Sequence, residues 1–134
     1  MTDDDRGGWV TARVLVVDDS AVIRQLITVN LELEGLEVEQ CDDGVEALDR
    51  IGTWRPDVVT LDVMMPRLGG FEVVERLRSD PVTAAIPVVM VTGRAAAADL
   101  ARGDELGVEA YLVKPFEPTE LVATVLRLLP DGAS

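Results

Sequence analysis

The chain has 134 residues, of which 48% are hydrophobic, so its length and composition fit one globular domain with a substantial core. A formal net charge of −13 disfavours direct contact with nucleic acid, because phosphate groups would be repelled. The sequence contains no histidine, which excludes histidine-based acid–base catalysis, Ser-His-Asp and Cys-His nucleophiles, and zinc sites with histidine ligands.

Five short apolar runs follow an acidic start and alternate with helical segments. Residues 1–11 have no apolar periodicity, which predicts a flexible arm. The apolar runs are mostly continuous and rich in β-branched residues, a pattern typical of strands that are buried on both faces of a parallel sheet. In chain order, the predicted strands are Val14–Val17, Val38–Cys41, Val58–Leu61, Val88–Val91 and Tyr111–Val113.

Apolar residues at three-to-four spacing predict a helix after each of these strands. In the first helix, Val22, Leu26, Val29 and Leu33 share one face, and Gly35 ends the helix. The later helices are indicated by Val45, Leu48 and Ile51, by Val73, Val74 and Leu77, by residues 95–106 with an interrupting Gly103, and by Leu121, Val122, Val125 and Leu128 after Pro118. Five consecutive strand–helix units predict an α/β, doubly wound five-stranded parallel sheet with helices on both faces, followed by a frayed tail at residues 130–134.

Polar side chains stand at the ends of four predicted strands. Asp18 and Asp19 follow the first strand, Asp62 the third, Thr92 the fourth, and Lys114, the only lysine of the chain, the fifth. The carboxyl ends of parallel strands meet at one edge, and doubly wound folds bind their ligands there. Taken alone, these residues have simpler interpretations: Asp18, Asp19 and the following Ser20 could cap the first helix, the threonine could begin a turn, and the lysine could be a solvated charge. Their coincidence at one edge favours a site.

Three carboxylates that are held together repel one another unless they are protonated or neutralised. Mg²⁺, or Mn²⁺ in its place, is suited to neutralise them because it takes oxygen ligands and keeps positions open for an oxyanion. With the hydroxyl of Thr92 and the ammonium of Lys114, such a cation would complete a site for a phosphoryl group. One of the carboxylates could then act as a nucleophile and form an acyl phosphate.

Four motifs at these positions together resemble the receiver domains of two-component response regulators. The motifs are VLVVDDS at 14–20, LDVMMPRLGG at 61–70, VVMVTGRA at 88–95 and AYLVKPF at 110–116. The resemblance spans residues 12–129 and rests on the combination of motifs, since any one of them is a weak signal. It implies a receiver domain over this range with the flavodoxin-like strand order 2-1-3-4-5.

The resemblance also implies roles for the acidic residues. Asp62 matches the phosphoacceptor of the family. Asp19 and Asp62, together with the backbone carbonyl of Met64, match the direct ligands of Mg²⁺, and Asp18 matches an acid that acts through a metal-bound water. Met64 and Arg94 match positions that flank the path of the hydrolytic water, so we expect both side chains to tune dephosphorylation.

Three further residues match the phosphate-binding and switch positions of the family. Thr92 matches the hydroxyl that moves towards the phosphoryl group, and Tyr111 matches the aromatic residue whose rotamer follows that movement. Lys114 matches the lysine that contacts the phosphoryl group, and its peptide bond to Pro115 is expected to be cis.

These matches predict a stand-alone receiver that accepts a phosphoryl group on Asp62. The donor would be the phosphohistidine of a sensor histidine kinase or a histidine phosphotransfer protein. Such a domain catalyses only its own phosphoryl transfer and dephosphorylation, so it is not an enzyme that turns over a separate substrate. We expect phosphorylation to switch a surface formed by the fourth helix, fifth strand and fifth helix, which would bind a downstream protein.

The sequence predicts a cytoplasmic protein without membrane insertion. No apolar stretch approaches the ~20 residues that span a bilayer. The acidic N-terminus lacks the positive charge and apolar stretch of a signal peptide. Cys41 is the single cysteine, so no disulfide can form within the chain, as is usual in a reducing compartment.

Other functions remain open at this point. The chain could be a pseudo-receiver that binds proteins without being phosphorylated, or the receiver fragment of a longer regulator. A Mg²⁺-dependent aspartyl-phosphate hydrolase would instead resemble D-x-D after the first strand. A flavin-binding protein of similar fold would need a phosphate loop rich in Ser, Thr and Gly where this chain has two acids.

Overall fold

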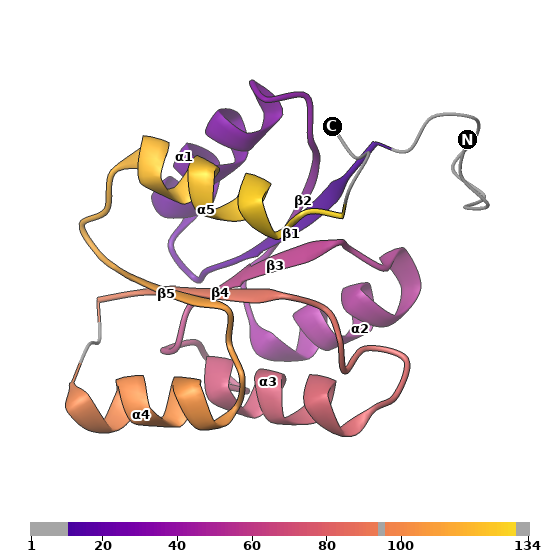
Figure 1. The fold of residues 1–134 in the computed structure, drawn as a ribbon, viewed down its shortest axis with the longest axis vertical. Helices are drawn as coiled ribbons and strands as arrows, with labels where there is room; N and C mark the ends of the chain where they lie inside the picture. The colour runs from indigo at the N-terminus through magenta and orange to yellow at the C-terminus, as the bar shows by residue number, and fades with distance from the viewer. Residues whose placement is uncertain (1–10, 94–95, 131–134) are drawn as a thin grey trace.

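Five strands alternate with five helices along the chain (Figure 1). The computed structural model describes residues 11–93 and 96–130. The elements are β1 (Arg13–Val17), α1 (Ala21–Glu32), β2 (Glu37–Cys41), α2 (Gly44–Trp54), β3 (Val58–Leu61), α3 (Gly70–Ser79), β4 (Val88–Thr92), α4 (Ala97–Glu105), β5 (Ala110–Val113) and α5 (Pro118–Leu128). The five predicted strand–helix units are confirmed, and no strand boundary differs from the prediction by more than one residue.

The strands form one parallel sheet in the order β2-β1-β3-β4-β5. Helices α1 and α5 cover one face of this sheet, while α2, α3 and α4 cover the other (Figure 1). The doubly wound fold and the strand order inferred from the resemblance are therefore both confirmed. The order changes direction between β1 and β3, where a doubly wound sheet opens a crevice at its carboxyl edge.

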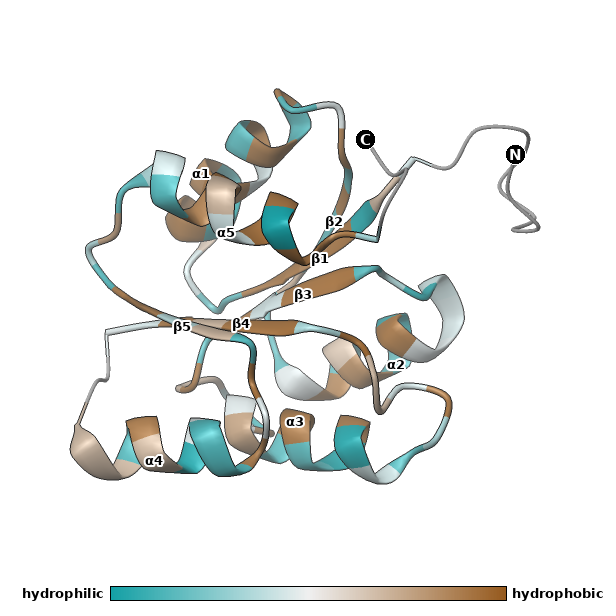
Figure 2. Ribbon diagram, in the orientation of Figure 1, coloured by the Kyte–Doolittle hydropathy of each residue, from teal (hydrophilic) through white to brown (hydrophobic). Residues whose placement is uncertain are grey.

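The core consists of two layers, one on each face of the sheet. All residues of β3 and β4 are buried, which explains why their sequences are continuous apolar runs (Figure 2). The edge strands β2 and β5 are only partly buried. Each fully buried Val or Leu side chain contributes about 1.5–3 kcal/mol relative to an exposed one, so the three central strands supply much of the stability of the fold.

Helix α1 packs through a different face from the one that its apolar spacing indicated. The side chains of Val22, Leu26, Val29 and Leu33 do share a face, but they are exposed, with Val22 and Leu33 at 78% and 77%. The helix instead buries a neighbouring stripe: Ile27, Thr28 and Leu31. The segment carries two apolar stripes about one residue apart, and only tertiary packing decides which of them is covered. On α2, Val45 is likewise exposed, and Ala47 and Ile51 are buried.

The remaining predictions about local structure have mixed outcomes. Pro118 occupies the first turn of α5, and the peptide bond between Lys114 and Pro115 is cis, as predicted. The predicted arm and tail lie outside the described residues, apart from Thr11 and Pro130, and so does Arg94. Among the described residues, no helix has the length and apolar character that crossing a bilayer requires.

Candidate functional site

The hydrogen-bond ladders of the sheet continue one residue beyond the strands and fix the polar residues that follow. The backbone N–H groups donate as follows: Asp18 to the carbonyl of Cys41 at 3.1 Å, Asp62 to Val17 at 3.0 Å, and Lys114 to Thr92 at 2.8 Å. Because Val17 pairs with Leu61 in the register of β1 and β3, the acids that follow these two residues lie side by side. The sheet therefore brings the predicted site residues to one edge.

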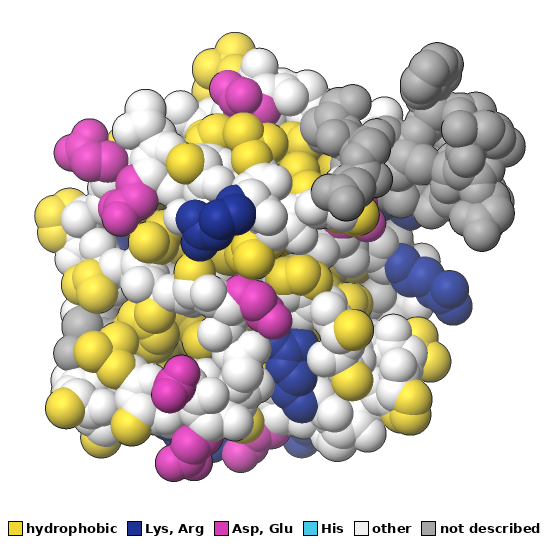
Figure 3. Space-filling model, viewed as in Figure 1, with side chains coloured by type: hydrophobic (Ala, Val, Ile, Leu, Met, Phe, Trp, Pro, Cys, Tyr) yellow, Lys and Arg dark blue, Asp and Glu magenta, His cyan; other side chains and the backbone are white. Residues whose placement is uncertain are grey.

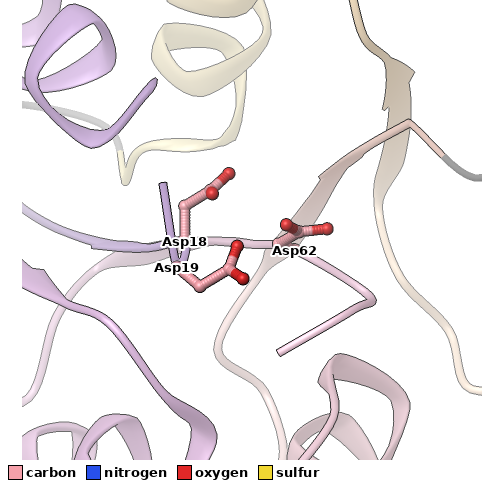
Figure 4. Close-up of side chains that lie close together, drawn as sticks. All are labelled: Asp18, Asp19 and Asp62. Atoms are coloured by element: carbon pink, nitrogen blue, oxygen red, sulfur yellow. The ribbon is translucent and has the colours of Figure 1, made fainter. Parts of the chain in front are cut away.

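Three carboxyl groups gather at this edge, two from the end of β1 and one from the end of β3 (Figure 4). One oxygen from each of Asp18, Asp19 and Asp62 lies within 4.8 Å of the others. Asp18 and Asp62 are 1% and 5% exposed, whereas Asp19 is exposed. Two nearly buried carboxylates next to a third are unfavourable unless a cation neutralises them.

Lys114 supplies one positive charge to this cluster from the end of β5. Its ammonium Nζ lies 2.7 Å from Oδ2 of Asp18 and 3.3 Å from Oδ2 of Asp62. Burial raises the pKa of Asp18 above its usual 3.8, and the hydrogen bond from Lys114 opposes this only in part. Burial alone would lower the pKa of Lys114, but the hydrogen bond to Asp18 and the charges of both acids raise it. The lysine therefore stays charged, and one ammonium faces three acids.

The turn between β1 and α1 combines capping with the candidate site. Ser20 is the N-cap of α1, and its Oγ accepts a hydrogen bond from the backbone N–H of Ile23 at 3.3 Å. The backbone N–H of Ser20 donates to Oδ1 of Asp18 at 2.9 Å. The capping interpretation is thus correct for Ser20. The carboxylate of Asp19 takes no part in capping and remains available to a ligand.

The loop after β3 approaches the backbone of Asp62 closely. A Cβ atom on Gly70 would lie 2.2 Å from the carbonyl oxygen of Asp62, so only glycine fits at the start of α3. The backbone N–H of Met64 donates to Oδ1 of Asp62 at 3.3 Å, and the side chain of Met64 is 56% exposed. The N–H of Met64 therefore holds one carboxylate oxygen of Asp62, and the ammonium of Lys114 contacts the other.

Thr92 and Tyr111 lie on the neighbouring strands β4 and β5, Thr92 at the carboxyl end and Tyr111 two residues before the end, paired with Met90. Thr92 is the last residue of β4, is 1% exposed, and pairs with Val113. Tyr111 is half-buried on β5, and its ring lies against α4, where a Cβ on Gly103 would be 3.3 Å from Cδ2. The small residue in α4 therefore makes room for the ring of Tyr111. Of the predicted site residues, only Arg94 lies outside the described part of the chain.

The donor set fits a hard divalent cation. All three clustered side chains offer carboxylate oxygens, and the site includes neither a thiolate nor an imidazole among the described residues. Oxygen-only sites with a net negative charge suit Mg²⁺ or Mn²⁺. The single ammonium leaves a net charge of about −2 when all three acids are ionised, which a divalent cation would balance.

Sequence reasoning missed two features next to the site. Arg24 on α1 donates from Nη1 to the backbone carbonyl of Asp18 at 2.8 Å. A cation close to the N-terminus of a helix is unfavourably placed in the helix dipole, and that was the available signal. The exposed apolar face of α1, which begins directly after Ser20, was also missed, because periodicity alone does not distinguish a solvent-facing stripe from a buried one.

Comparisons with a family model and with curated proteins point to the same family. The model of the response regulator receiver domain matches residues 14–126. The DNA-binding dual master transcriptional regulator RpaA of Synechocystis sp. is 40% identical over 117 residues, which are 87% of this chain and 48% of RpaA. The response regulator MprA of Mycobacterium bovis is 42% identical over 120 residues, which are 90% of this chain and 51% of MprA. The chain thus spans about half the length of these curated relatives.

Solved structures agree with the sequence matches. The chemotaxis protein CheY4 of Vibrio cholerae superposes with a TM-score of 0.84 at 39% identity, covering 90% of this chain and all of that one. The receiver domain of the Francisella response regulator 1452 gives 0.81 at 34% identity and covers 88% of this chain. The chain belongs to the response regulator receiver domain family of two-component systems.

Proposed function

We propose that this receiver accepts a phosphoryl group on Asp62 from the phosphohistidine of a sensor histidine kinase or a histidine phosphotransfer protein. The observation that carries the proposal is the position of Asp62. Its carboxylate is 5% exposed, belongs to the cluster of three acids and lies 3.3 Å from the ammonium of Lys114. A nucleophile held between a cation site and an ammonium is what phosphoryl transfer to a carboxylate requires.

The residues of the cluster would divide the binding of Mg²⁺ among them. Asp19 and Asp62 would be direct ligands, together with the carbonyl of Met64, and Asp18 would act through a water. When bound, the cation supplies positive charge that balances the oxygens of the phosphoryl group. Lys114 already holds Asp18 in the resting state, at 2.7 Å, so Asp18 needs no direct bond to the metal to be neutralised.

In the transfer step, an oxygen of Asp62 forms a bond to phosphorus as the bond between phosphorus and the donor imidazole nitrogen breaks. The electron pair of that bond stays on the imidazole nitrogen, and the product is an acyl phosphate. Lys114 exchanges its contact with Asp62 for one with a phosphoryl oxygen, and the hydroxyl of Thr92 donates to another. Tyr111, which lies against Gly103 of α4, would transmit the movement of Thr92 to that helix.

Release of the phosphoryl group requires water to reach the acyl phosphate. Met64 is exposed two residues after Asp62 and offers a thioether, which holds water poorly. Together with Arg94, it would shield the phosphoryl group and slow dephosphorylation. Met64→Asn should shorten the lifetime of the acyl phosphate, as measured by intact mass over time. An unchanged lifetime would contradict the role of Met64.

The protein that donates the phosphoryl group would dock on the exposed face of α1. Val22, Leu26 and Val29 form a shallow apolar patch there, with Gln25 and Asn30 beside them. The patch begins close to the acids, because α1 starts at Ala21, two residues after Asp19. A donor with a complementary apolar helical surface could bind it and present its phosphohistidine to Asp62. The downstream protein would instead bind the face of α4, β5 and α5, where Leu100, Val113 and Leu126 are exposed.

Charge on the surface supports a protein partner over nucleic acid. On the face drawn in Figure 3, the basic side chains of the described residues are separated from one another by acidic and uncharged groups. With a net charge of −13, this arrangement offers no continuous basic surface in that view to bind a phosphate backbone. Submicromolar binding to random duplex DNA at physiological salt would contradict this expectation.

Phosphorylation by a small-molecule donor tests the function directly. The wild type, incubated with acetyl phosphate and Mg²⁺, should gain one phosphoryl group by intact mass, and Asp62→Asn should gain none. Asp57→Asn is the matched control, because Asp57 lies before β3 at the opposite end and accepts a hydrogen bond from the backbone of Arg13. Labelling of Asp62→Asn at the wild-type rate would overturn the assignment. Failure of the wild type to be labelled would favour a pseudo-receiver.

A phosphorylated histidine kinase or phosphotransfer protein tests the docking face. Leu26→Gln should slow transfer from such a protein but leave labelling by acetyl phosphate unchanged, because the change affects recognition and not chemistry. Equal slowing with both donors would count against docking on α1.

A second candidate is a receiver that forms part of a longer regulator. The observation that favours it is that the chain spans about half the length of the curated relatives that it matches. The chemistry at Asp62 would be the same, and the downstream partner would be another domain. Sequencing of the complete reading frame distinguishes the two candidates.

A further inference from the structure

Arg24 links three elements around the acidic turn. It lies in α1, four residues after the N-cap Ser20. Its Nη1 donates to the backbone carbonyl of Asp18 at 2.8 Å, and its Nε donates to Oε1 of Gln40 on β2 at 3.2 Å. The guanidinium therefore ties the turn between β1 and α1 to the helix and to the neighbouring strand at once.

Arg24 holds the peptide group between Asp18 and Asp19. The orientation of this group influences the direction in which the side chain of Asp19 leaves the backbone. The carbonyl of Asp18 and the N–H of Asp19 belong to one planar unit, so fixing the oxygen fixes the start of Asp19 as well. Asp18 itself is held on both carboxylate oxygens, by Ser20 and by Lys114. The carboxylate of Asp19, in contrast, has no hydrogen-bond partner within the described residues. Its position in the cluster is therefore set by the direction of the backbone and by its own rotamer.

The position of Arg24 near the start of α1 does not favour the helix. The N-terminal end of a helix carries a partial positive charge, so a cation near it gains nothing from the helix dipole. The first turn of α1 contains no acidic residue with which Arg24 could pair. The contact with the carbonyl of Asp18 therefore explains this arginine better than helix stability does.

We propose that Arg24 is a positioning residue for the metal site: by holding the peptide between Asp18 and Asp19, it directs the Asp19 carboxylate towards Asp62 in the arrangement that binds Mg²⁺. This inference rests on the proposed function of the acidic cluster. The inference predicts that loss of Arg24 lowers the affinity for Mg²⁺, whereas the charge of Arg24 alone would predict a higher affinity after its loss. A cation near the site repels Mg²⁺, so removal of its charge alone would strengthen binding, whereas loss of positioning weakens it.

The test is the affinity of the protein for Mg²⁺ alone, measured by calorimetry and by amide chemical shifts. Arg24→Gln should weaken binding by about tenfold, the lower end of the range for residues that orient metal ligands. Arg24→Lys, which can still reach a carbonyl with a single donor, should recover part of the loss. Arg50→Gln is the matched control, since it removes the same charge from a partly exposed arginine of α2 that pairs with Glu39. It should bind Mg²⁺ like the wild type or slightly more tightly.

The unfolding free energy in EDTA separates positioning from a purely structural role. If Arg24 only stabilised the fold, Arg24→Gln would unfold more easily but bind Mg²⁺ normally below its unfolding transition. Equal or tighter Mg²⁺ binding by Arg24→Gln would overturn the inference. If that variant does not fold, Gln40→Ala removes the acceptor that orients the guanidinium and should weaken Mg²⁺ binding to a smaller extent; unchanged binding would again overturn it. Failure of the proposed function is distinguishable, because the wild type itself would then not bind Mg²⁺.

Discussion

The two ends of the sheet each hold a basic side chain among acceptors, but they use it in different ways. At the amino ends of β4 and β5, the guanidinium of Arg78 donates to four backbone carbonyls and one carboxylate. Its acceptors are the carbonyls of Ala84, Ile86, Leu106 and Gly107, at 2.7–3.1 Å, and Oε1 of Glu109 at 3.2 Å. At the carboxyl end, Lys114 shares one ammonium between Asp18 and Asp62.

The two ends differ in whether the groups around the basic side chain all have hydrogen-bond or charge partners. Every nitrogen of the Arg78 guanidinium has an acceptor, and Glu109 is held further by the backbone N–H of Val88 at 2.7 Å. At the other end, three acids face one ammonium, and Asp19 has no hydrogen-bond partner within the described residues. A planar guanidinium with fixed donors suits a permanent cross-link, whereas a flexible ammonium can exchange one oxygen for another. The contacts at the amino end therefore stabilise the fold, whereas the carboxyl end keeps a carboxylate available for the ligand that we propose.

The largest expected effect is the loss of Arg78. Arg78→Ala should lower the unfolding free energy by about 3 kcal/mol, because it leaves several partly buried carbonyls and the carboxylate of Glu109 without their donor. Urea unfolding followed by far-UV circular dichroism measures the loss. Arg76→Ala on the same helix is the control, because that side chain is exposed and should cost under about 0.5 kcal/mol. An equally small loss of unfolding free energy in Arg78→Ala would contradict the view that the amino end is the more strongly stabilised of the two.

Replacement of Lys114 should cost less, and the cost should depend on Mg²⁺. In EDTA at neutral pH, Lys114→Met should lower the unfolding free energy by about 1–2 kcal/mol, because Asp18 and Asp62 lose their cation. Added Mg²⁺ should recover most of this loss, since a divalent cation neutralises the same acids and binds only to the native state. The loss caused by Arg78→Ala should not respond to Mg²⁺. Equal responses of the two variants would contradict the comparison.

The pH dependence of this loss has a defined sign. Because burial raises the pKa of Asp18 in the folded state, Asp18 favours folding most below its usual pKa of 3.8, and this contribution is lost as the pH rises through the raised pKa. The deficit of Lys114→Met should therefore shrink as the pH falls from 7 and Asp18 becomes protonated in the folded state. Urea unfolding in EDTA at a series of pH values measures it. A deficit that grows on acidification would contradict the assignment.

The sequence predicts most of the side-chain arrangement at the carboxyl end of the sheet. It predicts almost none of the contacts at the amino end. Asp18, Asp62 and Lys114 follow continuous apolar strands, so the alternation of strands and helices places them together. Arg78 has no comparable signal, because its main acceptors are backbone carbonyls, which every residue possesses. The role of Arg24 is hidden for the same reason. Residue types predict side-chain chemistry well, but they do not predict which backbone groups a long side chain reaches.

The packing of α1 could not be predicted from the sequence, for a related physical reason. The helix carries two apolar stripes, and the one containing Ile27 and Leu31 faces the sheet beside α5. Periodicity measures how apolar residues repeat along a helix, and it contains no information on which stripe meets a neighbour. The stripe that contains Val22 and Leu26 remains exposed next to the acids. This exposed stripe is the surface to which we assign the docking of the donor.

Asp43 provides a further test of the comparison, with a smaller expected effect. It lies at the carboxyl end of the sheet, but its charge stabilises the fold. It is the N-cap of α2, where Oδ1 accepts from the backbone N–H of Glu46 at 2.8 Å, and it pairs with Arg67 of the loop after β3. These interactions, the hydrogen bond from Glu46 first, lower the pKa of Asp43 below 3.8. Its contribution to stability is therefore present above that value and is lost as the pH falls through the lowered pKa.

Asp43→Asn should isolate the ion pair, because asparagine still caps the helix but carries no charge. At pH 7 the variant should be less stable than the wild type, and the difference should disappear at pH values below the lowered pKa of Asp43. Urea midpoints across the pH range measure it, with Asp42→Asn, an exposed neighbour, as the control for the change in net charge. A difference that persists in strong acid would show that the cap, and not the charge, was disturbed.

The smallest expected effect concerns Cys41, which ends β2 beside the acidic turn. Its side chain is 2% exposed, and burial, followed by the charge of Glu46, raises the pKa of the thiol to about 12. The native thiol should therefore be unreactive at pH 8, and a thiol reagent should label it only when this end of the sheet opens. Because the carbonyl of Cys41 accepts from the N–H of Asp18, opening should disrupt the proposed Mg²⁺ site as well. Mg²⁺ should then slow labelling by the factor 1 + [Mg²⁺]/Kd, and the free energy of opening in EDTA should be smaller than that of global unfolding. Labelling in EDTA that requires global unfolding would mean that the carboxyl end is as rigid as the end held by Arg78, and that receiving a ligand there needs no local freedom.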